Sequence, residues 1–218
     1  MVKVKLYPPT KRIGGTSIYQ ITEKIDGENI GFYKWQGKLY IAQRNNIFTL
    51  DEILAEKNAM YKGLNEFIIE HGKDLEERLY DGSAVFGEWL GDTSHGYPKG
   101  TYDKLVYLFC KTRVLNQYEV DKNMNHEHEH IRYAFSGRTG LEPEIPPYVG
   151  VVPLVKKQDF EPSVEHLNWL YANYCDQVQR KVEGFVVYSC EHKSLKKYVR
   201  LKRGMLTEHL TKEYNENE

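Results

Sequence analysis

The chain has 218 residues and a formal net charge of -1 at pH 7, with 40% hydrophobic and 28% charged residues. A chain of this length can bury one sizeable core, and its composition is that of an ordinary globular protein, so we expect one domain. The charge excludes a polycation that coats nucleic acid with its whole surface. Any nucleic-acid contact must therefore come from a local basic surface.

The cysteine spacing and the hydropathy pattern indicate the cellular compartment of the protein. Cys110, Cys175 and Cys190 lie far apart without a C-x-x-C pair, so neither a zinc site nor a disulfide framework is indicated. The first 15 residues lack the apolar stretch of a signal peptide, and no apolar run approaches membrane-spanning length. We expect a soluble, cytoplasmic protein with reduced thiols and no membrane partner.

The first predicted elements are strands. Residues 17–24 form a predicted strand that leads into a turn at Asp26-Gly27. A hairpin follows, in which the strands 30–35 and 38–44 are joined across Gln36-Gly37.

A long helix is predicted next. Thr49 and Glu52 form a capping-box pattern at its start, and apolar residues then recur at helical spacing to Leu75. Gly63 and Gly72 argue against one unbroken helix. The remaining predicted elements are strands at 83–90, 105–109, 182–190 and 195–203, a polar loop at 121–130, and a helix at 163–178 with Ser163 as its N-cap. Strands interspersed with two helices predict an α+β domain rather than regular βαβ winding.

The segment E-K-I-D-G-E-N, residues 23–29, is the most informative. A lysine at a strand end, beside a glycine turn, can present its amine to a cleft. To attack phosphorus the amine must be neutral, although a lysine pKa is ordinarily about 10.4. Since burial and nearby cations favour the neutral form, the site should contain other basic groups. Asp-Gly is also a common turn, so a purely structural role stays open.

Two carboxylates stand out further along the chain. Strand alternation puts Glu88 between Phe86 and Leu90 on one face, where it needs a hydrogen-bond donor such as a ribose hydroxyl pair, a backbone group or a lysine. Glu183, just before a strongly β-forming run, can hold a hydrated magnesium ion against a triphosphate. The alternative for Glu183 is a charge that blocks pairing at a strand edge.

A basic strand is predicted at K-K-Y-V-R-L-K-R, residues 196–203. Alternation places Lys196, Tyr198, Arg200 and Lys202 on one face. Arg200 and Lys202 would then lie about 7 Å apart, close enough to bind one phosphate together. Their charges would also favour the neutral form of the Lys24 amine. A solvated basic face is the alternative.

In order and separation, these segments resemble the motifs of the covalent nucleotidyltransferase superfamily of polynucleotide ligases and capping enzymes. The similar segments are K-I-D-G, F-G-E, Y-L-F, E-G-F and R-L-K, between about residues 20 and 203. Asn29, two positions after Gly27, is similar to the RNA ligase 2 and RNA-editing ligase group, whereas DNA ligases and capping enzymes usually carry arginine there.

The resemblance implies an ATP-dependent RNA ligase with the nucleotidyltransferase (ligase adenylation) fold, mainly antiparallel sheets with flanking helices. It implies ATP, with Mg2+ or Mn2+ at Glu183, and covalent AMP on Lys24. Asp26 would orient Lys24 or interact with the acceptor end, and Glu23 would contact the adenine edge. The other implied nucleotide or phosphate contacts are Asn29, Arg44, Glu88 on ribose, Phe109 stacked on adenine, Glu183, Arg200 and Lys202.

Two positions depart from the pattern. Cys110 follows Phe109 where this group usually has aspartate, so the role of that aspartate is lost or relocated. Arg200 replaces the first lysine of a K-x-K motif, and arginine keeps the charge but cannot act as a neutral amine.

The length after Lys202 is a further expectation. Only 16 residues follow, with a polar tail from about 207, and neither an OB-fold nor a helical accessory domain fits there. We therefore expect residues 1–218 to form a single adenylation domain without an OB-fold. The expected partners are RNA ends in a nicked or bridged duplex and an accessory protein that assists strand recognition.

Several alternatives stay open. His126, His128 and His130 alternate as in a metal-binding strand, but the surrounding Glu and Asn favour a solvated loop. A minimal DNA ligase differs in its preference for DNA over RNA 3′ ends, and a guanylyltransferase in its use of GTP. A nucleotide- or RNA-binding module that keeps the fold without catalysis would bind nucleotide and form no adduct.

Overall fold

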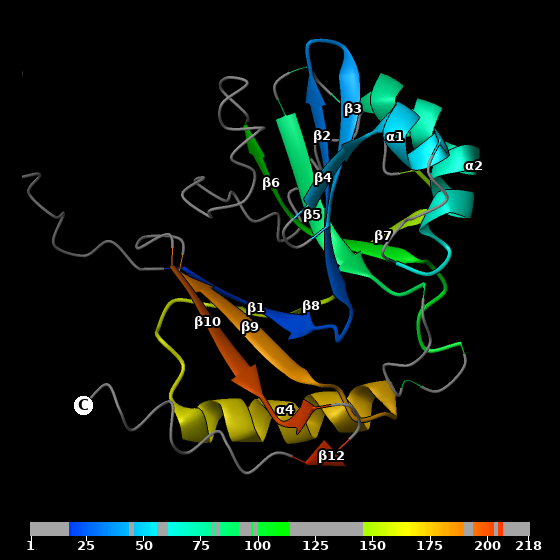
Figure 1. Ribbon diagram of the computed structural model, residues 1–218. Coiled ribbons are helices and arrows are strands. Elements are labelled where there is room, and N and C mark those ends of the chain that lie inside the picture. Colours follow the sequence, from blue (N-terminus) through cyan, green and yellow to red (C-terminus); the bar gives the residue numbers. More distant parts are fainter. Residues whose placement is uncertain are drawn as a thin grey trace, which may run out of the picture.

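The computed structural model describes residues 18–43, 46–55, 61–79, 81, 83–91, 97, 100–113, 146–189, 194–202 and 205–206. Its elements form two lobes, which we name upper and lower after their places in Figure 1. The architecture is α+β with mainly antiparallel sheets, as predicted. Within the described residues, no helix is long and apolar enough to span a membrane.

The lower lobe is a four-stranded antiparallel sheet with helix α4 on one face (Figure 1). The strand order is β10-β9-β1-β8. Ile21, Phe185 and Tyr198 point toward α4 and pack with Leu167 and Leu170 of that helix. The bounds are β1 Tyr19–Lys24, β8 Leu154–Gln158, α4 Val164–Val178, β9 Gly184–Ser189 and β10 Ser194–Val199, followed by the hairpin strands β11 Leu201–Lys202 and β12 Met205–Leu206.

The upper lobe is a six-stranded sheet in the order β4-β3-β2-β5-β6-β7, with only the β6–β7 pair parallel. Helices α1 and α2 lie on one side of it, and Phe67 and Leu75 of α2 pack with Phe32 and Trp89 from the strands. The bounds are β2 Glu28–Trp35, β3 Lys38–Gln43, β4 Asn46–Thr49, α1 Leu50–Ala55, α2 Leu64–Arg78, β5 Ser83–Trp89, β6 Val106–Arg113 and β7 Val149–Val151.

Local sequence signals placed several of these elements correctly. The predicted hairpin turns at Gln36-Gly37, both with positive φ, as a two-residue turn between strands requires. Thr49 and Glu52 form the reciprocal capping box, with N···O distances of 2.7 and 3.2 Å. Ser163 caps α4 by accepting a hydrogen bond from the His166 N–H.

Two predicted elements divide where the backbone changes direction. The long helix is two helices, because Gly63, with a φ of 80°, starts α2 in a left-handed conformation. The predicted strand 195–203 ends at Val199, bends at Arg200 and resumes as β11. The strands β4, β7, β8 and β12 were not predicted from the sequence, and the loop at 121–130 lies outside the described residues.

The described elements cross between the lobes at two places. Residues 25–27 join β1 to β2, and residues 152–153 join β7 to β8. Both crossings meet in one small cluster, where Ile25 and Val152 pack with Tyr107. The backbone ties them as well, because the Val152 N–H donates to the Leu108 carbonyl at 3.0 Å.

Gly184 sets the spacing between β9 and β10. A Cβ atom there would lie 1.9 Å from the carbonyl oxygen of Tyr198. We expect Gly184→Ala to lower the free energy of unfolding, measured by urea denaturation, by about 3 kcal/mol or more. Ser194→Ala, at an exposed position of β10, is the control and should change it by less than about 0.5 kcal/mol. Unchanged stability of Gly184→Ala would contradict this strand pairing.

Candidate active site

Lys24 and Glu183 meet at the boundary between the lobes. In the antiparallel β1–β9 pair, Lys24 lies opposite Gly184, so the residue before β9 comes beside the end of β1. The Lys24 Nζ donates to Glu183 Oε2 at 2.6 Å. Glu183 is only 7% exposed, whereas the Lys24 side chain remains accessible. The sequence-predicted nucleophile and the predicted metal-binding carboxylate are therefore in direct contact.

The surroundings of Glu183 fix its position and raise its pKa. Its carbonyl oxygen accepts hydrogen bonds from the backbone N–H groups of Arg200 and Leu201, at 2.7 and 2.9 Å. Burial raises the pKa of the Glu183 carboxyl, and the charge of Lys24 offsets this in part. The charge of Asp26 raises the pKa of Glu183 by a smaller amount, and the charge of Lys197 lowers it. Both charges therefore influence the Glu183 carboxyl.

Gly27 brings the predicted ribose-binding carboxylate near this pair. A Cβ at Gly27 would lie 2.8 Å from the Trp89 carbonyl oxygen and 3.1 Å from the Glu88 Cβ, so only glycine fits against the end of β5. Asn29 lies directly opposite Glu88 in the β2–β5 pair, and both side chains therefore share one face of the upper sheet. The structure thus brings Lys24, Asp26, Asn29, Glu88 and Glu183 to one region.

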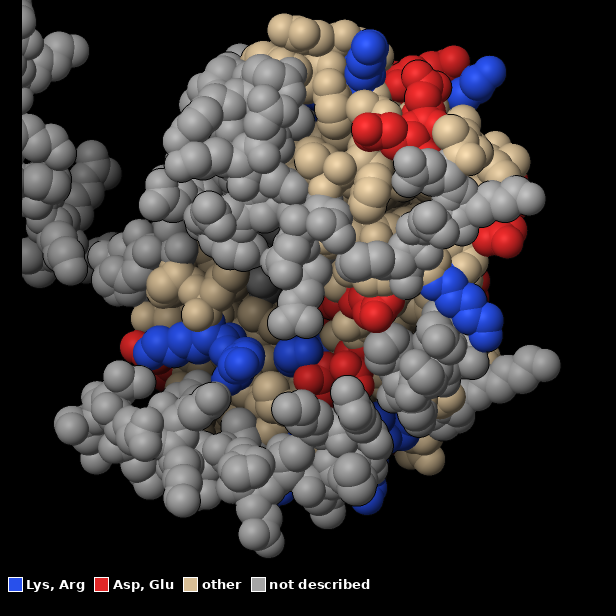
Figure 2. Space-filling view, in the orientation of Figure 1, with Lys and Arg blue, Asp and Glu red and all other residues tan. Residues whose placement is uncertain are grey.

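Lys197 is a cation of this region that the sequence analysis did not select. It pairs with Val186 in β10–β9, and Val186 pairs with Thr22 in β9–β1. By strand alternation Lys197 therefore shares a sheet face with Lys24, opposite to α4. Its side chain is exposed, and its charge lowers the pKa of Glu183. Figure 2 shows positive and negative side chains meeting in a band between the two lobes.

The predicted face of Lys196, Tyr198 and Arg200 exists, but it does not lie beside Lys24. Tyr198 is buried in the core under α4, and Lys196, on the same face, donates to Glu161 at 2.6 Å. Arg200 follows the bend and lies against α4, with its guanidinium 5.8 Å from the Tyr171 ring centroid and 3.3 Å from Asn168 Oδ1. Tyr198 donates to the same Asn168 Oδ1 at 2.6 Å, so Lys196, Tyr198 and Arg200 do share one side of the strand, but it is the side that packs against α4.

Glu23 lies on the opposite face of β1 from Lys24 and is 1% exposed. Its carboxylate accepts bonds from Arg180, Tyr174 and Tyr102. None of these three partners was selected from the sequence, because no local pattern distinguishes Arg180 from the neighbouring Lys181. The predicted contact of Glu23 with the adenine edge remains a prediction.

Other predicted residues fall partly or wholly outside the described residues. Arg44 and the histidines at 126, 128 and 130 lie outside them, as does the tail from 207. The side chains of Phe109 and Lys202 also lie outside the description, although their backbones belong to β6 and β11. The β5–β6 register shifts at the position of Phe109.

A divalent metal would have one well-placed oxygen ligand here. The described residues contain no group of three or more His, Cys, Asp or Glu that could hold a metal. Magnesium bound with phosphate usually takes only one or two carboxylates and keeps several waters. The Glu183 carboxylate, close to an accessible lysine, fits that requirement.

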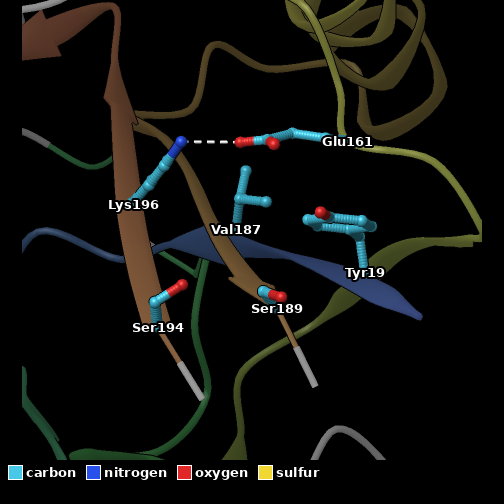
Figure 3. Close-up of a pocket in the computed structure, with 6 residues that line it drawn as sticks. All are labelled: Tyr19, Glu161, Val187, Ser189, Ser194 and Lys196. Atoms are coloured by element: carbon cyan, nitrogen blue, oxygen red, sulfur yellow. Dashed lines mark hydrogen bonds and ion pairs between the residues drawn. The ribbon is translucent and has the colours of Figure 1, made fainter. Parts of the chain in front are cut away.

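A separate pocket of about 90 Å³ opens on the α4 side of the lower sheet (Figure 3). Lys196 binds Glu161 at this pocket, and Tyr19 and Val187 also line it. Neither Lys24 nor Glu183 lines it. This pocket is therefore distinct from the region around Lys24.

Comparison with known proteins identifies the family. The family model described as RNA ligase matches residues 17–203, most of the chain. The chain belongs to the RNA ligase family. No curated protein matches it significantly.

Among solved structures, this family member is similar to RNA ligases of Naegleria gruberi. The ligase with PPi is 18% identical with a TM-score of 0.47, and a variant with ATP and Mn is 17% identical with a TM-score of 0.47. A variant without ligand is 19% identical with a TM-score of 0.46. Each match covers 84% of this chain and 50% of the other, so the chain spans about half the length of those proteins.

Adjacent lysines of β10 provide a test of which face binds phosphate. Lys197→Ala should raise the Kd for an ATP analogue with a methylene bridge between the α and β phosphorus atoms, by roughly three- to tenfold, because it removes a cation near Lys24. Lys196→Ala removes the same charge from the opposite face and should change the Kd by less than about twofold. Calorimetric titration measures both. Equal effects of the two variants would contradict this assignment.

Proposed function

We propose that the chain is an ATP-dependent RNA ligase domain that carries AMP on Lys24 during each cycle. The observation that carries the proposal is the contact of the accessible Lys24 amine with the buried Glu183, in a chain of the RNA ligase family. We further propose the nucleotidyltransferase fold for this domain, with residues 1–218 as one unit.

In the first step the Lys24 nitrogen attacks the α-phosphorus of ATP. An N–P bond forms, the bond from that phosphorus to the bridging oxygen breaks, and pyrophosphate leaves. The amine proton passes to the Glu183 carboxylate, whose Oε2 lies 2.6 Å away. Asp26, whose charge raises the pKa of Glu183, would help to orient the amine.

The remaining residues of the region would bind the nucleotide. Glu88, facing Asn29 across β2–β5, accepts from the ribose hydroxyls. Phe109 stacks on adenine, while Arg44 contacts the nucleotide and the strand end. Lys202 and Lys197 balance negative charge on the phosphates. Magnesium or manganese, held by Glu183 and phosphate oxygens, would supply further charge neutralisation.

Two further steps would join RNA. The 5′-phosphate oxygen of one RNA end attacks the phosphorus of the lysyl-AMP, which breaks the N–P bond and returns the amine to Lys24. A 3′-hydroxyl then attacks the adenylated 5′-phosphate, forms the phosphodiester and releases AMP. We propose a nicked or bridged RNA duplex as the substrate, with an accessory protein assisting its recognition.

One observation favours a second candidate function. Arg200, at the position of a family phosphate-binding lysine, lies against α4 rather than beside Lys24. A nucleotide- or RNA-binding module that has lost catalysis would tolerate this placement. Such a module would bind ATP without a covalent adduct.

Incubation with ATP labelled at the α-phosphate, together with magnesium, should leave AMP on the protein. Lys24→Arg should abolish the label, because arginine keeps the charge beside Glu183 but is not a neutral nucleophile. Lys181→Ala, an exposed lysine of the same lobe, is the matched control and should retain it. Gel autoradiography measures the label. Binding of ATP by the native protein without any label would support the non-catalytic module instead.

The strand preference is a separate prediction. At a single nick, an RNA 3′ end should be joined at least about tenfold faster than a DNA 3′ end, a difference of about 1.4 kcal/mol in transition-state binding. Matched duplexes that differ only in the sugar of the 3′-terminal nucleotides measure it. Equal or faster joining of the DNA end would favour a minimal DNA ligase.

A further inference from the structure

Glu23, next to the proposed nucleophile, has its carboxylate completely enclosed. The Arg180 guanidinium binds it through two parallel bonds, Nη1 to Oε1 at 2.8 Å and Nη2 to Oε2 at 2.9 Å. The Tyr174 hydroxyl donates to Oε2 at 2.8 Å, and the Tyr102 hydroxyl donates to Oε1. Each carboxylate oxygen therefore accepts two bonds, which fills its usual acceptor capacity.

The protonation of the two tyrosines supports this arrangement. Burial, and secondly the negative charge of Glu23, raise the pKa of Tyr102 and Tyr174 well above the ordinary value. Both phenols therefore keep their protons and act as donors. The Arg180 guanidinium also lies 4.9 Å from the centroid of the Tyr102 ring, a cation–π contact that adds to the enclosure.

The network joins three segments that are distant in the sequence. Glu23 belongs to β1, Tyr174 to α4, and Arg180 follows α4, while Tyr102 lies between β5 and β6. The same β5–β6 connection supplies Tyr97, whose hydroxyl oxygen accepts a hydrogen bond from the Asp26 backbone N–H at 2.5 Å. The chain is thus held on both sides of Lys24, through the Glu23 side chain before it and the Asp26 backbone after it.

We propose that Arg180 is a positioning residue for Lys24, and that Glu23 is its internal anchor rather than a contact for the adenine base. This inference rests on the proposed function of Lys24. Because side chains alternate along β1, fixing Glu23 beneath the sheet fixes the direction in which Lys24 leaves it. Arg180 acts through Glu23 and does not touch the nucleotide.

A contact between Glu23 and adenine would require this network to open. The exocyclic amine of the base could bond to the carboxylate only if Arg180 or a tyrosine gave up its own bond. That partner would then be buried without an acceptor, which is costly. The family resemblance assigns the nucleophile to Lys24 and the base contact to the adjacent Glu23. The geometry supports the first role and gives Glu23 a structural role in place of the second.

Single-turnover formation of lysyl-AMP tests the positioning role. Arg180→Met should lower the rate at saturating ATP by at least about tenfold and change the half-saturating ATP concentration by less than about twofold, because the nucleophile is displaced while nucleotide contacts remain. Arg180→Lys keeps the charge without the two-bond fork and should fall between Arg180→Met and the native protein. Lys181→Met is the matched control and should behave as native. A weaker half-saturation with an unchanged rate would overturn the proposal.

The base contact is tested with purine riboside triphosphate, which lacks the exocyclic amine of ATP. Glu23→Met should slow the labelling with both nucleotides by the same factor, leaving their ratio within about twofold of the native ratio. Tyr174→Phe, which removes one bond only, provides the same comparison in a less perturbed protein. Loss of discrimination in Glu23→Met, with discrimination retained in Tyr174→Phe, would show that the carboxylate contacts the base.

A double-mutant cycle on stability tests the contact between Glu23 and Arg180 independently of the proposed function. Thermal unfolding of Glu23→Met, Arg180→Met and the double variant requires no activity. Each single variant should lower the Tm by roughly 10 °C, because each leaves a buried group without its partner, and the double variant should lose clearly less than the sum. Additive losses would overturn the anchor. If the losses are non-additive but the native protein takes no AMP label, the anchor role of Glu23 stands and the role of Lys24 as nucleophile is rejected.

Discussion

The pairing of β1 with β9 is the constraint on which the site depends. It brings Lys24 opposite Gly184 and so places its amine on Glu183, 159 residues away in the sequence. A register shift of one residue would exchange the faces of β1, turning Lys24 into the core under α4 and Glu23 toward the upper lobe. The bonds that Arg180, Tyr174 and Tyr102 donate to the Glu23 carboxylate resist such a shift.

Local sequence signals located β1, β2 and β9 around Lys24, but they could not show which side chains meet in the buried network beneath it. Lys24 was selected because it lies at a strand end before a glycine turn, and Glu183 because it precedes a strongly β-forming run. The bond between Arg180 and Glu23 spans 157 residues and has no local signature. Burial decides which face of a strand points into the core. Tyr198, predicted to lie on a basic face, is 1% exposed, so this face of β10 points toward α4 and Lys197 points away from it.

The missed strands have a related physical explanation. No strand was predicted in the proline-containing segment before α4, yet β7 and β8 lie there. Both are edge strands of their sheets, where proline is tolerated because one side needs no backbone donor. Pro153 stands between them at a crossing, and its carbonyl accepts the Glu23 N–H at 2.9 Å.

The shared cluster at the two crossings has a mechanical consequence. Since residues 25–27 and 152–153 pass side by side through the contacts of Ile25, Val152 and Tyr107, rotation of one lobe against the other would pivot there. Points near a pivot move least. Lys24 stands one residue from it, so Lys24 and Glu183 would keep their separation while the distant rims of the lobes move apart.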